Sequence, residues 1–162
     1  TTLLADLIPL LVARGLRIST IKHAHHEFDV DKPGKDSYRH REAGATEVLI
    51  SSARRFALMH EHRGTAEPTL DDLVARLSAV DLVLVEGFKH ERHAKIEVWR
   101  SEVGKPMLQP NDPNVIAVAS DQPVPGLAVP VLDANVPVQI ADFIIDWMAR
   151  PAVGGARRGA AE

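Results

Sequence analysis

Two short runs of this sequence are continuously apolar, and they constrain the possible folds more than any other feature. Leu82–Val85 and Val115–Ala119 contain no polar residue, which is typical of strands covered on both faces within a parallel sheet. Segments with helical periodicity alternate with such strand candidates along the chain. We therefore predict an α/β fold with a mainly parallel, doubly wound sheet, helices on both of its faces, and Leu82–Val85 as a central strand.

The other elements follow from local patterns. Helical periodicity predicts four helices, over residues 3–12, 38–43, 70–77 and 140–147. Ser37 and Thr69 stand directly before the second and third of these helices, and we expect them to cap the helix N-termini. Further strands are predicted at Arg17–Lys22, Glu47–Ser51, Phe56–His60, Lys95–Trp99 and Val129–Leu132. Pro130 would confine the last of these strands to a sheet edge.

Length and composition indicate one globular domain. The chain has 162 residues, of which 45% are hydrophobic and 25% charged; we expect a domain over residues 1–150 and a disordered, Gly-rich tail over 151–162. A net charge of −3 argues against a nucleic-acid-coating surface, and no apolar run approaches the roughly 20 residues that span a bilayer. The sequence has no cysteine, which excludes disulfides and thiolate metal sites and favours a reducing, cytoplasmic location.

Polar residues follow three of the predicted strands at their carboxyl ends, where open α/β sheets bind ligands. Lys22 ends the first strand, the pair Glu86-Gly87 follows the central one, and Asp121 comes after Val115–Ala119. Glu86 resembles the Walker-B carboxylate that orients Mg²⁺ beside a phosphate; the alternative is a cap on the following turn. Asp121 could accept both N1–H and N2–H of guanine, or could be an ordinary turn residue.

Three ordered blocks of sequence resemble one known family. The segment from Lys22 to Arg39 reads KHAHHEFDVDKPGKDSYR and is followed by REAGA at 41–45; LVLVEGFK at 82–89 and IAVASD at 116–121 complete the pattern. These blocks closely resemble the molybdopterin-guanine dinucleotide biosynthesis adapter proteins, the MobB family. The resemblance extends from Thr1 to about Met148, nearly the whole chain.

This resemblance implies a P-loop NTPase-like fold that binds GTP and Mg²⁺ and is at most a slow GTPase. It also implies that the protein assists molybdopterin guanylyltransferase, the enzyme that attaches GMP to molybdopterin. In the family, the phosphate-binding glycine loop, its lysine and the strand ahead of them precede the residues that match Thr1-Thr2. The printed sequence does not contain them, so we expect this chain to bind GTP poorly and a longer parent chain to bind GTP well ahead of ATP.

Roles for individual residues follow from the resemblance together with the strand-end positions. Thr1 and Glu86 would hold Mg²⁺, with Glu86 acting in hydrolysis, and Asp121 would read guanine. The nucleotide phosphates, or the ligand of the partner enzyme, would be contacted by Thr2, Lys22, Lys35 and Arg39.

Two other functions remain open from the sequence. A cluster formed by His23, His25, His26, Asp29 and Asp31 suggests a nickel-delivering GTPase, a metallochaperone on a similar fold. Adjacent histidines point to opposite faces of an extended segment, so a polar ligand-contacting loop is favoured over a metal site. The second alternative is an ATP-dependent ligase or kinase, for which no activating base stands out beside Glu86.

The segment Lys95–Trp99 alternates polar and apolar residues, as an exposed edge or a projecting hairpin does. Val98 and Trp99 would give such a hairpin apolar surface, and unpaired strand edges invite pairing with a second copy. We therefore expect a homodimer through this segment. Burial of Trp99 within its own monomer is the alternative.

Overall fold

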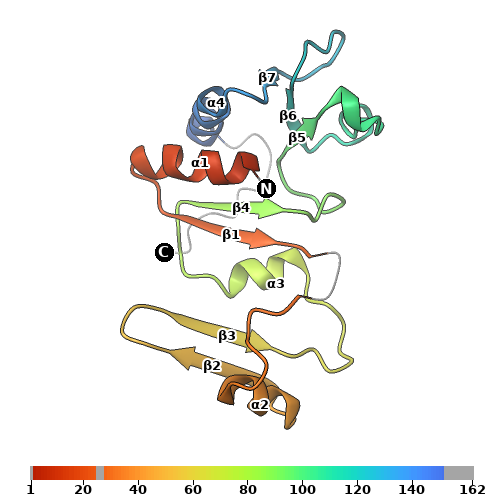
Figure 1. The fold of residues 1–162 in the computed structure, drawn as a ribbon. Coiled ribbons are helices and arrows are strands. Elements are labelled where there is room, and N and C mark those ends of the chain that lie inside the picture. The colour runs from red at the N-terminus through yellow and green to blue at the C-terminus, as the bar shows by residue number, and fades with distance from the viewer. Residues whose placement is uncertain (1, 25–27, 152–162) are drawn as a thin grey trace.

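The computed structural model describes residues 2–24 and 28–151. Its elements, in chain order, are α1 (Thr2–Ala13), β1 (Ile18–Lys22), α2 (Asp36–Glu42), β2 (Glu47–Ser51), β3 (Phe56–His60), α3 (Leu70–Ala75), β4 (Leu82–Glu86), β5 (Lys95–Trp99), the short 3₁₀ turns η1 (Ser101–Val103) and η2 (Gln109–Asn111), β6 (Val115–Ser120), β7 (Val131–Asp133) and α4 (Pro137–Ala149). The tail beyond 151, for which disorder was expected, lies outside the described residues. The alternation of strands and helices confirms the α/β class (Figure 1).

The strands form three groups, two of which are parallel. β1 pairs in parallel with β4, and β5, β6 and β7 form a parallel sheet in the order β5-β6-β7. β2 and β3 form an antiparallel hairpin. The sheet is thus mainly parallel, as predicted, and β7, directly after Pro130, lies at an edge.

β4 differs from the central strand that its apolar run suggested. All five of its residues are half-buried, neither exposed nor enclosed. Among the described residues it pairs with β1 alone, so the sheet ends at β4 on that side.

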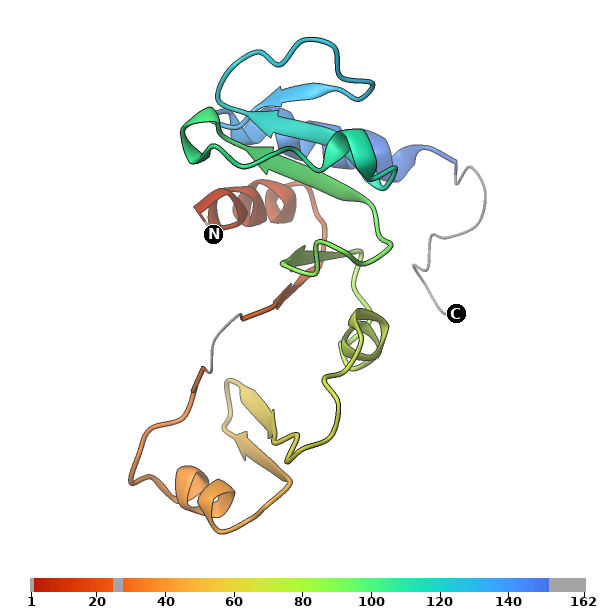
Figure 2. The ribbon, with the colours of Figure 1, turned by 90° about the vertical axis from the view of Figure 1, so that its right-hand side faces the viewer.

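The core is formed where α1 and α4 pack together against β6. Leu7 and Leu11 of α1 are buried against Ile140 and Ile144 of α4, with Ala119 of β6 in the same cluster. Burial of this apolar stripe outweighs the unfavourable position of Pro9 inside α1. Figure 2 shows both helices on one side of the molecule, alongside β5 and β6. No described helix is long and apolar enough to cross a membrane.

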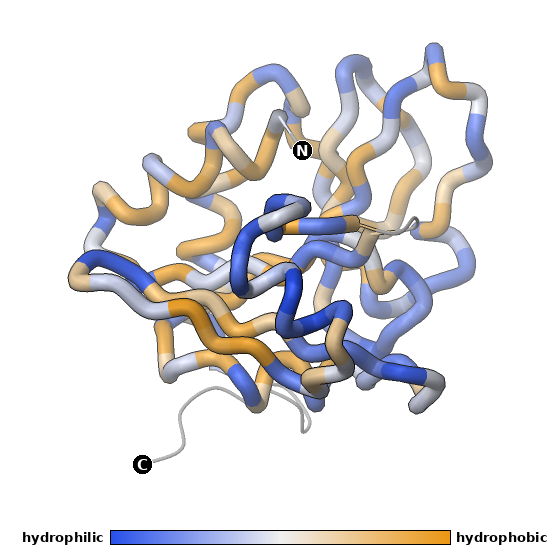
Figure 3. Tube along the Cα trace, turned by 60° about the horizontal axis from the view of Figure 1, so that its bottom comes forward, coloured by the Kyte–Doolittle hydropathy of each residue, from blue (hydrophilic) through white to orange (hydrophobic). Residues whose placement is uncertain are grey.

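The projecting hairpin lies elsewhere than the sequence suggested. Lys95–Trp99 is β5, which is paired in parallel with β6, whereas the hairpin is β2–β3, with α2 packed on β2. β2, β3 and α2 extend away from the parallel strands (Figures 1 and 2). Both strands of the hairpin carry hydrophobic stretches that flank the hydrophilic turn at 52–55 (Figure 3).

The two predicted helix caps have different outcomes. Thr69 forms a capping box, in which its hydroxyl accepts from the Asp72 backbone N–H and Asp72 accepts from the Thr69 backbone N–H. Ser37 does not cap α2, which begins one residue earlier, and its hydroxyl donates to Asp31 instead at 2.9 Å. The Ser37 prediction is therefore wrong.

Candidate functional site

Lys22 and Glu86 meet at the carboxyl ends of β1 and β4. They are partners in the parallel register, and the Lys22 Nζ to Glu86 Oε1 distance is 3.2 Å. The backbone N–H of His23 donates to the Glu86 carbonyl at 2.8 Å and so extends the ladder by one residue. The two side chains predicted at different strand ends thus share one edge of the sheet, where ligands bind in parallel α/β folds.

A tight turn follows Glu86 and fixes the carboxylate at that edge. Gly87 has a φ of +97°, and a Cβ added there would lie 2.6 Å from His23 Cβ. Phe88 also has a positive φ of 51°, and its ring stacks at a tilt on the His23 imidazole with centroids 4.8 Å apart. Glycine is therefore required after Glu86 both for its backbone conformation and for the close approach of His23.

Glu67 joins this group from a distant part of the sequence. Its Oε1 lies 2.9 Å from His23 Nε2, so the segment before α3 returns to the end of β1. Glu67 was not identified from sequence, because it stands in a loop with no distinguishing pattern. Phe88 belongs to the block at 82–89 that resembles the family, but no role was assigned to it.

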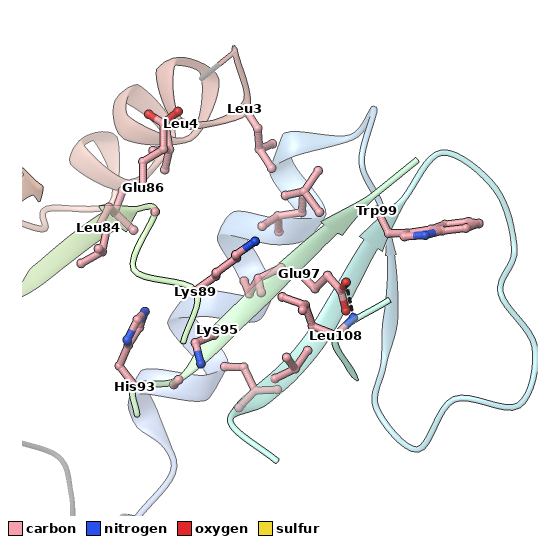
Figure 4. Close-up of a pocket in the computed structure, with 18 of the residues that line it drawn as sticks. Leu3, Leu4, Leu84, Glu86, Lys89, His93, Lys95, Glu97, Trp99 and Leu108 are labelled. Atoms are coloured by element: carbon pink, nitrogen blue, oxygen red, sulfur yellow. Dashed lines mark hydrogen bonds between the residues drawn. The ribbon is translucent and has the colours of Figure 1, made fainter. Parts of the chain in front are cut away.

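The first turn of α1 lies beside the same edge. Leu3 and Leu4 line a cavity of about 750 Å³ together with Glu86 and Lys89, and Figure 4 shows Leu4 next to Glu86. Thr2 is exposed at the start of α1, and its contact with the nucleotide phosphates stays a prediction. Thr1, the other predicted magnesium ligand, lies outside the described residues.

The cavity wall is mostly apolar, and six charged side chains also line it: Glu86, Lys89, Lys95, Glu97, Arg100 and Lys105. His93 also lines it, and burial, followed by the positive charge of Lys95, holds the pKa of His93 below its usual value. A neutral imidazole is therefore favoured at neutral pH.

Asp121 follows β6 in the other parallel sheet. Its Oδ2 lies 3.9 Å from Arg100 Nη1, while its Oδ1 is buried with no hydrogen-bond partner among the described residues. A buried carboxylate oxygen of this kind is costly unless a ligand or water satisfies it. Asp121 therefore retains the capacity to accept from a ligand.

Lys35 and Arg39 do not join the Glu86 edge. Lys35 is the N-cap of α2, and Arg39, exposed on that helix, forms a 4.0 Å ion pair with Asp36. α2 lies at the far end of the molecule from β4 in Figures 1 and 2. The structure thus separates these two cations from Lys22.

Arg41 is engaged by three carboxylates and is only 13% exposed. Its guanidinium donates to both oxygens of Asp29 at 2.8 and 2.9 Å and to Glu61 at 3.1 Å, and its Nε lies 3.4 Å from Asp31. These contacts, those to Asp29 first, raise the pKa of Arg41 above its already high value. Arg41 therefore ties the loop after β1 to the hairpin.

The suggested metal cluster has no support among the residues that the structure describes. They include no group of three His, Cys, Asp or Glu side chains arranged to hold a metal ion. Asp29 and Asp31 contact Arg41 instead. His25 and His26 lie outside the described residues.

Comparison with known proteins gives one consistent family. The sequence model of the family described as "Molybdopterin guanine dinucleotide synthesis protein B" (MobB) matches residues 1–121. The molybdopterin-guanine dinucleotide biosynthesis adapter protein of Escherichia coli (strain K12) is 50% identical over 153 residues, which cover 93% of this chain and 87% of the relative. The adapter protein of the same description from Haemophilus influenzae is 46% identical over 151 residues, with coverage of 91% and 82%.

Solved structures agree with these sequence matches. A crystal structure of molybdopterin-guanine biosynthesis protein B superposes with a TM-score of 0.66 at 26% identity, covering 90% of both chains. A MobB homologue from Bacillus stearothermophilus gives the same TM-score and identity over 91% of this chain and 88% of its own.

Proposed function

Because this chain belongs to the MobB family of molybdopterin guanine dinucleotide synthesis proteins, we propose that it acts as an adapter in the synthesis of molybdopterin guanine dinucleotide. The main support is that two relatives, each matching more than nine tenths of this chain, are both described as molybdopterin-guanine dinucleotide biosynthesis adapter proteins. The partner we propose is the guanylyltransferase that joins GMP to molybdopterin, and the site of action is the cytoplasm.

We further propose that the Glu86 edge serves GTP and Mg²⁺. The support is the position of a carboxylate and a lysine together at the carboxyl ends of parallel strands. When bound, Mg²⁺ would neutralise phosphate charge. Glu86 would orient the ion or its water, Thr1 would add its hydroxyl, and Lys22 would exchange its contact with Glu86 for one with a phosphate oxygen. Asp121 would accept from N1–H and N2–H of guanine with its two carboxylate oxygens, one of which, Oδ1, has no partner among the described residues.

A reconstituted reaction tests the adapter role. Full-length protein is added to purified molybdopterin guanylyltransferase with molybdopterin, GTP and Mg²⁺, and dinucleotide formation is measured at limiting GTP. Wild type should raise the yield, whereas Glu86→Gln should not. Glu91→Gln is the control, because Glu91 is an exposed acid of the same turn region, and it should raise the yield as wild type does. Outer-shell groups at metal sites typically change metal affinity about 10- to 100-fold, so Glu86→Gln should need correspondingly more Mg²⁺.

Two negative results have different meanings. A wild-type protein that neither binds the enzyme nor alters the yield overturns the adapter role. A Glu86→Gln protein that works as well as wild type leaves the adapter role in place and removes Glu86 from the magnesium site. Preference for ATP over GTP would favour the ligase or kinase alternative, and stoichiometric Ni²⁺ binding would favour the metallochaperone.

We also propose a homodimer, but through a different surface from β5. The Trp99 indole N–H donates to the Lys105 carbonyl of its own chain at 3.0 Å, so this ring is already engaged. The hairpin instead exposes Leu49, Phe56 and Leu58 by 59%, 71% and 48%, and the strand register puts all three on one face. Such apolar patches mark association surfaces.

Sedimentation of three proteins tests this interface. Wild type and Trp99→Asp should sediment as dimers at micromolar concentration, and Leu58→Asp should sediment as a monomer. A monomeric wild type rejects the dimer, and loss of the dimer in Trp99→Asp alone would return the interface to β5.

A further inference from the structure

Arg100 and Asp121 stand just past the ends of two neighbouring parallel strands. β5 ends at Trp99 and β6 at Ser120, and these two residues are partners in the register. The residues that follow them are therefore brought together, and Arg100 Nη1 lies 3.9 Å from Asp121 Oδ2. In Figure 2 the arrowheads of β5 and β6 lie at the same end of the molecule as that of β4. The pair thus shares with Glu86 the edge where open α/β sheets bind ligands.

The backbone after β5 fixes the position of Arg100. Its φ of −127° and ψ of 130° continue the extended geometry of the strand, and its carbonyl accepts from the Val103 N–H at 3.1 Å. The Trp99 indole donates to the Lys105 carbonyl at 3.0 Å, which holds the following loop against β5. Arg100 is therefore held in place without any use of its guanidinium.

Neither side chain of the pair uses its hydrogen-bonding capacity within the part of the chain that the structure describes. A separation of 3.9 Å is too long for a hydrogen bond. Arg100 is 46% exposed, and an ion pair of this kind contributes little to stability. Asp121 Oδ1 is buried and has no partner among the described residues, although buried carboxylate oxygens are normally paired. The pair therefore presents two acceptor oxygens in line with a set of donors.

This order of groups matches the hydrogen-bonding edge of guanine. Along that edge guanine carries the O6 acceptor, the N1–H donor and the N2–H donor, in that order. Oδ1 and Oδ2 of Asp121 can accept from N2–H and N1–H. Because Arg100 lies on the Oδ2 side, its guanidinium then faces O6. Adenine has a donor amino group in place of O6 and an acceptor at N1, so it opposes both residues, and uracil lacks the second donor.

We propose that Arg100 is a specificity-determining residue of the nucleotide site, which donates to O6 of guanine while Asp121 accepts from N1–H and N2–H. This inference rests on the proposed binding of GTP and on the role proposed for Asp121. The contact to O6 is charge-assisted and therefore stronger than a neutral hydrogen bond. The guanidinium also offsets the repulsion between the carboxylate and a bound triphosphate.

Competition binding with two altered nucleotides tests this assignment. Inosine triphosphate lacks the N2 amino group and keeps O6, whereas 6-thioguanosine triphosphate keeps both donors and has sulfur, a weak acceptor, in place of O6. Each is compared with GTP on full-length protein in the presence of Mg²⁺. The proteins are wild type, Arg100→Ala, Asp121→Asn and Arg92→Ala. Arg92 is the matched control, because it is an exposed arginine of the loop that leads into β5.

The two residues should affect different ratios of affinity. Wild type should prefer GTP over the thio analogue by about tenfold or more, the value of a hydrogen bond to a charged group. Arg100→Ala should reduce this ratio to near one and keep the preference for GTP over inosine triphosphate. Asp121→Asn should do the reverse, and Arg92→Ala should keep both ratios. Arg100→Met, which retains an apolar stem but no donor, should repeat the result of Arg100→Ala.

The ratios are taken within each protein, so a general loss of affinity cancels. An unchanged GTP-to-thio ratio in both Arg100 variants overturns the proposal, including the case in which all three nucleotides weaken equally through lost charge alone. Wild type that does not bind GTP is a different failure, because it removes the proposed GTP site itself. A GTP-to-inosine ratio that survives Asp121→Asn removes the role of Asp121, and with it the proposed pairing with Arg100.

Discussion

Lys95 donates from Nζ to Asp112 Oδ2 at 2.7 Å, and this pair joins the first residue of β5 to the loop that enters β6. Asp112 Oδ1 accepts from the backbone and side chain of Asn114 as well. The side chains of Lys95 and Asp112 are only 10% and 21% exposed. Both oxygens of one carboxylate are therefore used to set the register of two parallel strands.

This pair predicts acid sensitivity in a narrow range. The hydrogen bond from Lys95, followed by those from Asn114, lowers the pKa of Asp112 from 3.8 to about 2. A carboxyl with a lowered folded-state pKa stabilises the fold fully above its unfolded-state pKa, and this contribution is lost as the pH falls toward 2. The melting temperature should therefore drop between pH 4 and pH 2 more steeply in wild type than in Asp112→Asn, as calorimetry can measure. Parallel curves for the two proteins would show that the pair adds no acid sensitivity.

Gly87→Ala should lower the free energy of unfolding more than the same substitution does at a glycine with open space around its Cα. The new methyl group would lie 2.6 Å from His23 Cβ, and φ is +97°; backbone strain alone costs about 1–3 kcal/mol. Gly126→Ala is the matched control, because its φ is +81° and nothing lies within 4 Å of the added Cβ. Urea unfolding should show the larger loss for Gly87→Ala; equal losses would mean that His23 moves aside freely.

Arg41→Lys should loosen the loop after β1 while leaving the parallel strands intact. A lysine cannot reproduce the forked contacts with Asp29 and Glu61. Limited proteolysis should then cut the segment 28–35 faster than in wild type. Arg39→Lys is the control, since Arg39 is 75% exposed and its loss should not alter cleavage. Unchanged cleavage in Arg41→Lys would contradict the anchoring role.

Asp121→Asn should reduce the GTP-over-ATP preference of the full-length protein. An amide offers one acceptor and one donor where guanine requires two acceptors, and a hydrogen bond to a charged group contributes about 1.5–3 kcal/mol. The expected loss of preference is therefore about tenfold or more, measured by competition binding. Asp146→Asn, on the exposed side of α4, should have no effect. Preserved selectivity in Asp121→Asn would mean that guanine is read elsewhere.

The parts of the fold that the sequence predicts are those determined by local chemistry. Leu82–Val85 forms a strand and Thr69 caps α3, as expected, because both depend on neighbours in sequence. The central position predicted for that strand depends on its neighbours in the sheet, and this part of the prediction was wrong. The prediction of an exposed hairpin at Lys95–Trp99 was wrong because a polar residue of this strand is covered. Glu97 accepts hydrogen bonds from the backbone N–H groups of Leu108 and Gln109, so a loop of the same chain lies over the polar face that the alternating pattern had suggested was exposed.

The candidate site was predictable only in part, for a similar reason. Glu86 and Lys22 could be placed because parallel strands bring their carboxyl ends to one edge. Glu67 contacts His23 across 44 positions of sequence, and the carboxylates that bind Arg41 are brought to it only by tertiary packing. No local pattern in the sequence therefore reveals either contact. Ser37 bonds to Asp31 rather than to its own helix because the folded loop brings that carboxylate within 2.9 Å.

The contact between His23 and Glu67 has one more consequence. The polypeptide leaves the end of β1 at His23 and comes back to it at Glu67, with the two side chains 2.9 Å apart. One side-chain contact therefore connects the start and the end of the segment that contains α2 and the hairpin. A change at either residue would remove this link, so a single substitution could alter how the α2–hairpin arm is held against the parallel strands.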